Sequence, residues 1–266
     1  PEIVVAAAAT GVRQQSARGF LLDSCADDKV LSYRLDDPNR LTVFELRSAH
    51  ELGRYPHAPG FVLGLSPSCT KLYTQDLDGT IFRIDLATPG ERKFVATAHG
   101  HVFEVKRSAP FGSAGPGLLM ALSSGEVVRI DENDDSVRLL ARANPRVTAL
   151  SDGVVPGQTV FADHTGIYRI DQTGIERLAA PRIGSAWEDI IASPGARALV
   201  LASRNELAVI DEKVGTITGS VKLEGFTRGA LWDPSGAVLL YPNGSQGVAR
   251  AQLLIFPGRD HADLDA

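Results

Sequence analysis

The sequence predicts an all-β fold built from repeated units of about four strands. The first observation behind this prediction is a recurring phrase, in which a turn residue is followed by alternating apolar residues and a terminal Ile-Asp pair. The phrase occupies residues 79–85, 125–131, 165–171 and 205–211. Its terminal aspartates (85, 131, 171 and 211) lie 46, 40 and 40 residues apart. A spacing of this kind is typical of a repeat architecture.

A second phrase recurs at a constant offset before the first. Ser66-Pro67, Ser193-Pro194 and Asp233-Pro234 each precede an apolar run by a few residues, and Pro194 and Pro234 are again 40 residues apart. Weaker copies of the first phrase occupy residues 41–46 and 251–256, which brings the number of units to six. No window shows the i, i+3, i+4, i+7 pattern of an amphipathic helix.

Four-stranded units of about 40–45 residues are the building blocks of β-propellers. We therefore predict a single domain over residues 1–266, a six-bladed propeller of antiparallel four-stranded blades, with seven blades as the alternative. A seventh blade would need about 40 more residues. The predicted blades are 18–56, 60–98, 101–142, 146–180, 186–223 and a last one that starts near residue 226.

The last predicted blade ends after its third strand, at residues 251–256. The apolar segment 3–9 is an unassigned strand at the other end of the chain. We expect it to complete the last blade, because an open ring would leave unpaired strand edges. The polar residues 258–266 are expected to form a flexible tail.

Residues 65–86 carry a family resemblance. Leu65-Ser66-Pro67-Ser68, Leu72-Tyr73-Thr74 and the stretch 78–86 resemble a repeat of the bacterial WD40-like, YVTN-type propellers. The chain departs from true WD40 repeats, because Trp232-Asp233 stands at the end of a predicted first strand and no third strand ends in Trp-Asp. The resemblance implies a propeller whose relatives are mostly interaction platforms, with some enzymes among them.

Composition narrows the possible functions. The net charge of −5 and an aromatic content of 6% argue against nucleic-acid binding. No apolar run approaches the roughly 20 residues that span a bilayer, so no membrane insertion is predicted. Cys25 and Cys69 are expected to be buried thiols, which fits a reducing compartment. We predict a cytoplasmic protein, with an exported chain whose signal peptide has been removed as the alternative.

Motifs for catalysis are missing from the sequence. It contains neither the Gly-x-Ser-x-Gly nucleophile motif nor a phosphate-binding loop, so no catalytic residue, cofactor or metal is predicted. His57, His99 and His101 fall in connecting loops and could together bind zinc. Glu104 and Asp189, with their neighbours, could instead form a carboxylate cluster near the axis.

The loops that connect one blade to the next are rich in arginine and lie on one face of a propeller. Arginine forks suit carboxylates and phosphates, and Trp and Arg are enriched at binding hot spots. The predicted partner-binding residues are Arg142, Arg146, Arg182, Trp187, Phe226 and Arg228. We predict a non-enzymatic platform that binds another protein through this face. The alternatives are a metal-dependent lactonase or hydrolase with its site in the central channel, and a sensor of a small anionic ligand.

Overall fold

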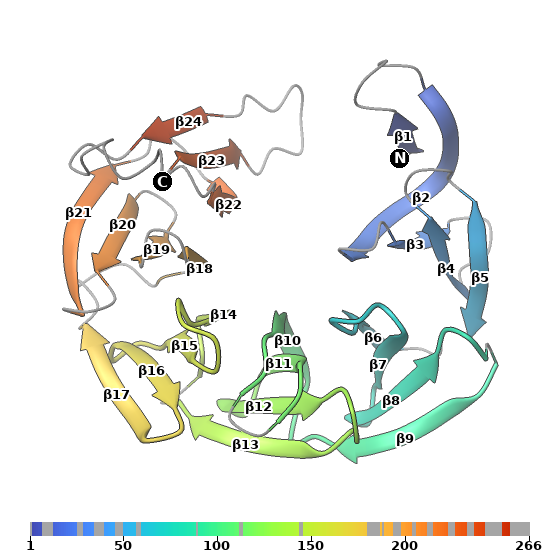
Figure 1. Ribbon diagram of the computed structural model, residues 1–266, viewed down its shortest axis with the longest axis horizontal. Helices are drawn as coiled ribbons and strands as arrows, with labels where there is room; N and C mark the ends of the chain where they lie inside the picture. Colours follow the sequence, from blue (N-terminus) through green and yellow to red (C-terminus); the bar gives the residue numbers. More distant parts are fainter. Residues whose placement is uncertain are drawn as a thin grey trace.

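A computed structural model gives the arrangement of the chain (Figure 1). It describes residues 2–6, 13–25, 29–34, 40–45, 50–56, 60–88, 90–111, 114–143, 146–179, 187, 189–193, 198–203, 206–211, 215–222, 227–232, 237–242 and 252–255. Strands and turns make up this part of the chain. Within it, no helix could cross a membrane. The prediction of an all-β fold is confirmed.

The described strands form six antiparallel sheets, and within each sheet the strands lie in chain order. The first sheet has five strands: β1 (Glu2–Ala6), β2 (Arg13–Cys25), β3 (Lys29–Arg34), β4 (Arg40–Glu45) and β5 (Glu51–Pro56). The last sheet has three: β22 (Thr227–Trp232), β23 (Ala237–Pro242) and β24 (Gln252–Ile255).

Four sheets between these two have four strands each. The second sheet contains β6 (Gly60–Leu65), β7 (Lys71–Asp76), β8 (Thr80–Asp85) and β9 (Arg92–Thr97). The third contains β10 (Val102–Ser108), β11 (Gly117–Leu122), β12 (Glu126–Asp131) and β13 (Val137–Arg142). The fourth contains β14 (Ala149–Asp152), β15 (Thr159–Ala162), β16 (Ile167–Asp171) and β17 (Gly174–Ala179). The fifth contains β18 (Asp189–Ser193), β19 (Ala198–Ala202), β20 (Glu206–Asp211) and β21 (Thr216–Lys222). These bounds agree with the sequence prediction to within a few residues.

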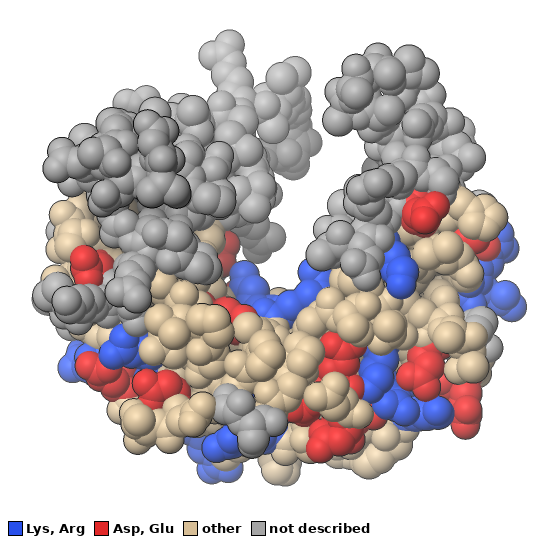
Figure 2. All heavy atoms as spheres, in the orientation of Figure 1, with Lys and Arg blue, Asp and Glu red and all other residues tan. Residues whose placement is uncertain are grey.

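The sheets follow one another in an arc around a central space, and from the second sheet onward the first strand of each sheet is innermost and the last strand outermost (Figure 1). The space-filling view shows the central space as a hollow, with basic atoms on its wall and mixed charges around the outside (Figure 2). The inner strands therefore carry residues of two kinds, some buried in the cores between sheets, such as Ile190, and others partly exposed, such as Lys106.

The repeated Ile-Asp pair ends the third strand of the second to fifth sheets. The four isoleucines are buried, and turns directly follow Asp85, Asp131 and Asp171. Asp131 Oδ1 accepts the Asn133 backbone N–H at 2.8 Å, and Asp171 Oδ1 accepts that of Thr173 at 2.7 Å. A carboxylate that accepts an N–H two residues on forms an Asx turn. The repeat is therefore explained by packing and turn formation.

Hydrophobic cores fill the space between neighbouring sheets. The first and second sheets share a core that includes Leu31, Leu41, Tyr55 and Leu72. Similar cores join the second sheet to the third, the third to the fourth and the fourth to the fifth. Because each core takes side chains from two sheets, the first five sheets stabilise one another in sequence.

The N-terminal strand is placed differently from the sequence prediction. We expected residues 3–9 to complete the last sheet, but β1 pairs antiparallel with β2, from Glu2 opposite Arg18 to Ala6 opposite Arg13. The second half of β2 pairs with β3 instead, from residue 19 onward. The unusual length of β2 therefore supplies β1 with a partner close in sequence, which costs less loop-closure entropy than pairing with the far end of the chain.

Candidate binding site at the connection face

Connections from one sheet to the next lie against the hairpins between second and third strands, at one end of the ring. The Ala98 N–H donates to the Gly79 carbonyl at 3.0 Å, and the Ser123 N–H donates to the His101 carbonyl at 2.8 Å. The Ala143 N–H donates likewise to the Gly125 carbonyl at 2.8 Å. We call this end the connection face. Its described residues used below are Phe61, Leu77, His99, His101, Phe103, Arg142 and Arg146.

A buried glutamine holds the connection between the second and third sheets. The side-chain amide of Gln75, on β7, donates to the carbonyls of Gly79 at 3.2 Å and Gly100 at 3.0 Å. Its oxygen accepts the Val102 N–H at 2.9 Å. Gln75 is fully buried, and its bonds to the Gly79 carbonyl and the Val102 N–H are buried too, so this one side chain satisfies backbone groups inside the protein. It thereby positions the start of β10.

Two large aromatic side chains are exposed where the inner strands begin. Phe61, on β6, is 42% exposed, and Phe103, on β10, is 48% exposed. The Phe61 ring lies 5.4 Å from the His101 ring, centroid to centroid. A bulge between Val102 and Glu104 makes Phe103 the extra residue of β10, and bulges re-aim side chains in this way. The hairpin residue Leu77 adds a further exposed apolar side chain.

Residues farther along β10 form ion pairs with each other and with an inner strand of another sheet. Lys106 Nζ lies 3.3 Å from Glu104 Oε1 and 3.1 Å from Asp189 Oδ1. Glu104 and Lys106 belong to the third sheet, whereas Asp189 begins the inner strand of the fifth sheet. The ion pair therefore reaches past β14, the inner strand of the fourth sheet. We call Glu104, Lys106 and Asp189 the channel triad.

Burial dominates the acid–base chemistry of the channel triad. It raises the pKa of Glu104 to about 7, against the opposing effects of the Lys106 ammonium and a hydrogen bond from the Leu150 backbone. Burial also disfavours the charged form of Lys106, but the carboxylates of Asp189 and Glu104 outweigh it and raise the Lys106 pKa. Lys106 thus stays protonated near neutral pH, where Glu104 exchanges its proton.

The structure places the predicted partner-binding residues in different surroundings. Arg142 is 71% exposed on the connection face, where its guanidinium lies 3.0 Å from Glu126 Oε1. Arg146 is also exposed there. Arg182 and Phe226 fall outside the described residues, and for Arg228, on β22, the structure describes the backbone alone.

Trp187 corrects the sequence prediction of an exposed hot spot. Its side chain is 1% exposed and packs in the core between the fourth and fifth sheets, with Ile190 and Leu199 among its neighbours. A large apolar ring just before an inner strand can point toward the core or toward solvent. Position in the sequence does not distinguish these directions. Here the indole points toward the core, because burial of its apolar surface is favourable.

The sequence also suggested a zinc site of three histidines and a cluster of carboxylates near the axis, and the structure places some of these residues. His99 and His101 are exposed, and His57 lies outside the described residues. The described residues contain no group of three or more His, Cys, Asp or Glu side chains placed to hold a metal ion. Of the carboxylates expected near the axis, the structure joins Glu104 and Asp189 through Lys106.

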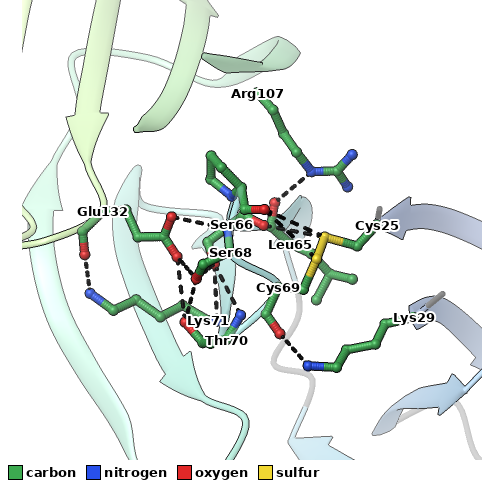
Figure 3. The surroundings of a disulfide bond; sticks show 11 residues. Cys25, Lys29, Leu65, Ser66, Ser68, Cys69, Thr70, Lys71, Arg107 and Glu132 are labelled. Carbon is green, nitrogen blue, oxygen red and sulfur yellow. Dashed lines mark hydrogen bonds between the residues drawn. A yellow bond between two sulfur atoms is a disulfide. The ribbon is translucent and has the colours of Figure 1, made fainter. Parts of the chain in front are cut away.

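Cys25 and Cys69 form a disulfide, which corrects the expectation of two free thiols (Figure 3). Their Cα atoms are 6.0 Å apart, within the usual disulfide range. Cys25 ends β2 in the first sheet, and Cys69 lies in the turn between β6 and β7 of the second. The Lys29 ammonium, on β3, donates to the Cys69 carbonyl at 3.0 Å. The first two sheets are therefore linked covalently as well as by their shared core.

Comparison with known proteins informs the fold alone. No family model matches the chain, and no curated protein matches it. Among solved structures, it is similar to the crystal structure of the computationally designed Ika8 protein, with a TM-score of 0.63 and 16% sequence identity. The match covers 88% of this chain and 72% of that one. Because 1520 chains of solved structures match, the fold is common, and a common fold does not define a function.

Proposed function

We propose that this protein is a non-enzymatic platform that binds a protein partner through the connection face. The observation that carries the proposal is the pair of exposed aromatic rings, Phe61 and Phe103, on neighbouring inner strands. Aromatic side chains dominate binding hot spots, and exposed apolar groups gathered on one face mark interaction sites. Arg142 and Arg146 supply a polar margin on the same face.

Loss of the two rings tests this proposal. With the purified protein as bait, we expect the Phe61→Ala/Phe103→Ala variant to lose the partner that the wild type captures. Phe94→Ala is the matched control, because Phe94 is 65% exposed but lies on β9, an outer strand. Equal capture by the wild type and the double variant would exclude the connection face. Equal loss in the control would show that the effect is not specific to this face.

We propose further that the six sheets are the blades of one propeller domain, related to the WD40-like, YVTN-type repeats that the sequence resembles. Six antiparallel sheets in chain order around a hollow support this arrangement. Cores shared between neighbouring sheets support one cooperative unit. A single unfolding transition, superimposable by fluorescence and circular dichroism, is the expected result, and two separate transitions would contradict it.

The disulfide also bears on where the protein works. Disulfides persist in oxidising compartments and are rare in the cytosol. We therefore propose the exported alternative over the cytoplasmic one. Thiol labelling of the protein in the intact cells that make it tests this choice. We expect Cys25 and Cys69 to be labelled only after reduction. Labelling without reduction would indicate that the protein works in a reducing compartment.

A further inference from the structure

The channel triad has more negative than positive charge. Two carboxylates, Glu104 and Asp189, share one ammonium, that of Lys106, so the fully ionised triad carries a net charge of −1. Asp189 Oδ1 accepts from Lys106 at 3.1 Å and from the Ile190 N–H at 2.9 Å. No described residue donates to the other oxygen, Oδ2. Within the described part of the chain, Oδ2 of Asp189 is therefore open to an incoming donor.

Aromatic rings lie at the same end of the inner strand that carries the triad. Phe103 directly precedes Glu104 on β10, and Phe61 contacts His101 just before that strand. Organic cations bind where a ring face lies beside a carboxylate, because the ring quadrupole and the negative charge attract them together. An anion would instead have to approach two carboxylates that already surround Lys106.

We propose that the mouth of the hollow binds the ammonium or guanidinium group of a basic side chain that a protein partner inserts between Phe61, Phe103 and the channel triad. This inference rests on the proposed function, because it names the chemistry of that partner. The exposed rings suit the apolar stem of a Lys or Arg side chain, while Glu104 and Asp189 suit its charged head. A free metal ion or simple ammonium would make no use of the rings.

Proton linkage gives the site a specific signature. Among the described residues, the charged groups that face Glu104 are Lys106 on its own strand and Asp189 on β18, and the Leu150 backbone on β14 forms a hydrogen bond with it. A bound cation favours the ionised form of Glu104, whose pKa is about 7 in the free protein. Affinity for the cation is therefore expected to rise with pH through neutrality, and binding to release protons. An anion would show the opposite dependence.

The test uses short capped peptides as probes. Their binding is measured from changes in the NMR chemical shifts of the full chain. The first probe is acetyl-Gly-Arg-Gly-amide, and its matched control contains citrulline, which keeps the shape of arginine without its charge. We expect the arginine peptide to bind and the citrulline peptide to bind at least about tenfold more weakly, as a lost charge-assisted hydrogen bond implies. Agmatine is the third probe, because it carries a guanidinium without a peptide.

Three variants are expected to change the affinity for the arginine peptide, two of them downward and one upward. Asp189→Asn and Glu104→Gln are expected to weaken the arginine peptide about tenfold, and Glu104→Gln also to remove the rise of affinity with pH. Lys106→Met is expected to strengthen binding, because it removes the competing ammonium. A purely structural role would give weakening in all three. Melting curves establish that each variant is folded, and Glu104→Gln keeps the test decisive if Asp189→Asn unfolds.

Several outcomes would overturn the inference. They are no binding of the arginine peptide, equal binding of the citrulline peptide, weaker binding by Lys106→Met, or affinity that falls as pH rises. Agmatine binding as tightly as the peptide would assign the site to a free small cation and overturn the partner as its source. If these probes fail while the Phe61→Ala/Phe103→Ala variant still loses its partner, the inference fails and the proposed function stands.

Discussion

Single side chains in this ring owe their properties to two or three neighbouring sheets. Glu104 is the clearest case, because its carboxylate lies against the backbone of β14 and the ammonium of Lys106, which in turn reaches Asp189 on β18. The same glutamate on an exposed strand would titrate near its ordinary pKa of 4.5. Burial between sheets moves its proton equilibrium into the physiological range.

The first prediction concerns the pH dependence of stability. The pKa of Glu104 is about 7 in the folded protein and 4.5 in its ordinary environment. Between these values the folded state holds a proton that the unfolded chain has released. Glu104 therefore lowers the free energy of unfolding as pH rises from 4.5 to about 7, and its effect is constant above that range.

Glu104→Gln removes this contribution. We expect the variant to lose less stability than the wild type between about pH 5 and about pH 8, measured by urea unfolding at each pH. Asp152 also has a pKa raised by burial, and it contributes equally to both proteins. Identical pH dependence in the two proteins would show that Glu104 titrates normally.

The second prediction concerns Trp187, whose indole fills the core between the fourth and fifth sheets. Trp187→Ala is expected to lower the free energy of unfolding by about 3–5 kcal/mol, because it leaves a large cavity. Arg146 is an exposed residue in the connection between the third and fourth sheets. Arg146→Ala is expected to change the free energy of unfolding by less than about 0.5 kcal/mol. Denaturant unfolding of both variants checks this. A Trp187→Ala protein that keeps its stability but no longer binds the partner would support the predicted role of Trp187 in partner binding.

At the scale of elements, side chains rather than strand patterns determine how sheets connect. The connection between β9 and β10 is held by Gln75 on β7, a strand that β8 separates from β9. Its amide serves carbonyl and N–H groups that would otherwise be buried without partners. The position of the connection face therefore depends on a side chain that is fully buried, that of Gln75.

The third prediction follows from this arrangement. Gln75→Leu is expected to lower the free energy of unfolding by about 2–3 kcal/mol, because it leaves the buried Val102 N–H and the partly buried Gly100 carbonyl without their partner. Gln172→Leu is the matched control, since Gln172 is exposed in the turn between β16 and β17. Urea unfolding measures both. Equal, small effects would mean that water replaces the amide.

At the scale of the whole molecule, neighbouring sheets are joined by shared cores and by specific polar links. The loop between β12 and β13 of the third sheet contacts the turn of the second sheet through Glu132, which accepts the Ser68 N–H at 3.1 Å. Lys71 and Tyr73 both contact Asp135 of the same loop, at 3.2 and 3.0 Å. The disulfide adds a covalent link between the first and second sheets (Figure 3).

The fourth prediction concerns that disulfide. It joins residues 44 apart in sequence, so it restricts the unfolded chain considerably. We expect Cys25→Ser/Cys69→Ser to lower the free energy of unfolding by about 2–4 kcal/mol. A reductant is expected to destabilise the wild type by a similar amount and to leave the double variant unchanged, as measured by thermal unfolding. No response of the wild type to reductant would contradict the role of this link.

Local sequence patterns predict the all-β class and the approximate bounds of the sheets. Turn residues, alternating apolar positions and the Ile-Asp pairs act within a few residues of one another, so their pattern can be read from the chain. The four complete sheets lie where the repeat predicts them. Exposed arginines at positions 142 and 146 were also predictable, because a connection between sheets runs over the surface.

Features that depend on which sheets face each other follow from packing between distant parts of the chain. This packing buries Trp187, pairs Cys25 with Cys69, sets β1 beside β2 and joins Lys106 to Asp189 across an intervening strand. The exposed Phe61 and Phe103 belong to this group too, since a bulge and a neighbouring connection turn them outward. These contacts join residues tens of positions apart, and their energy depends on burial and geometry that local patterns do not encode.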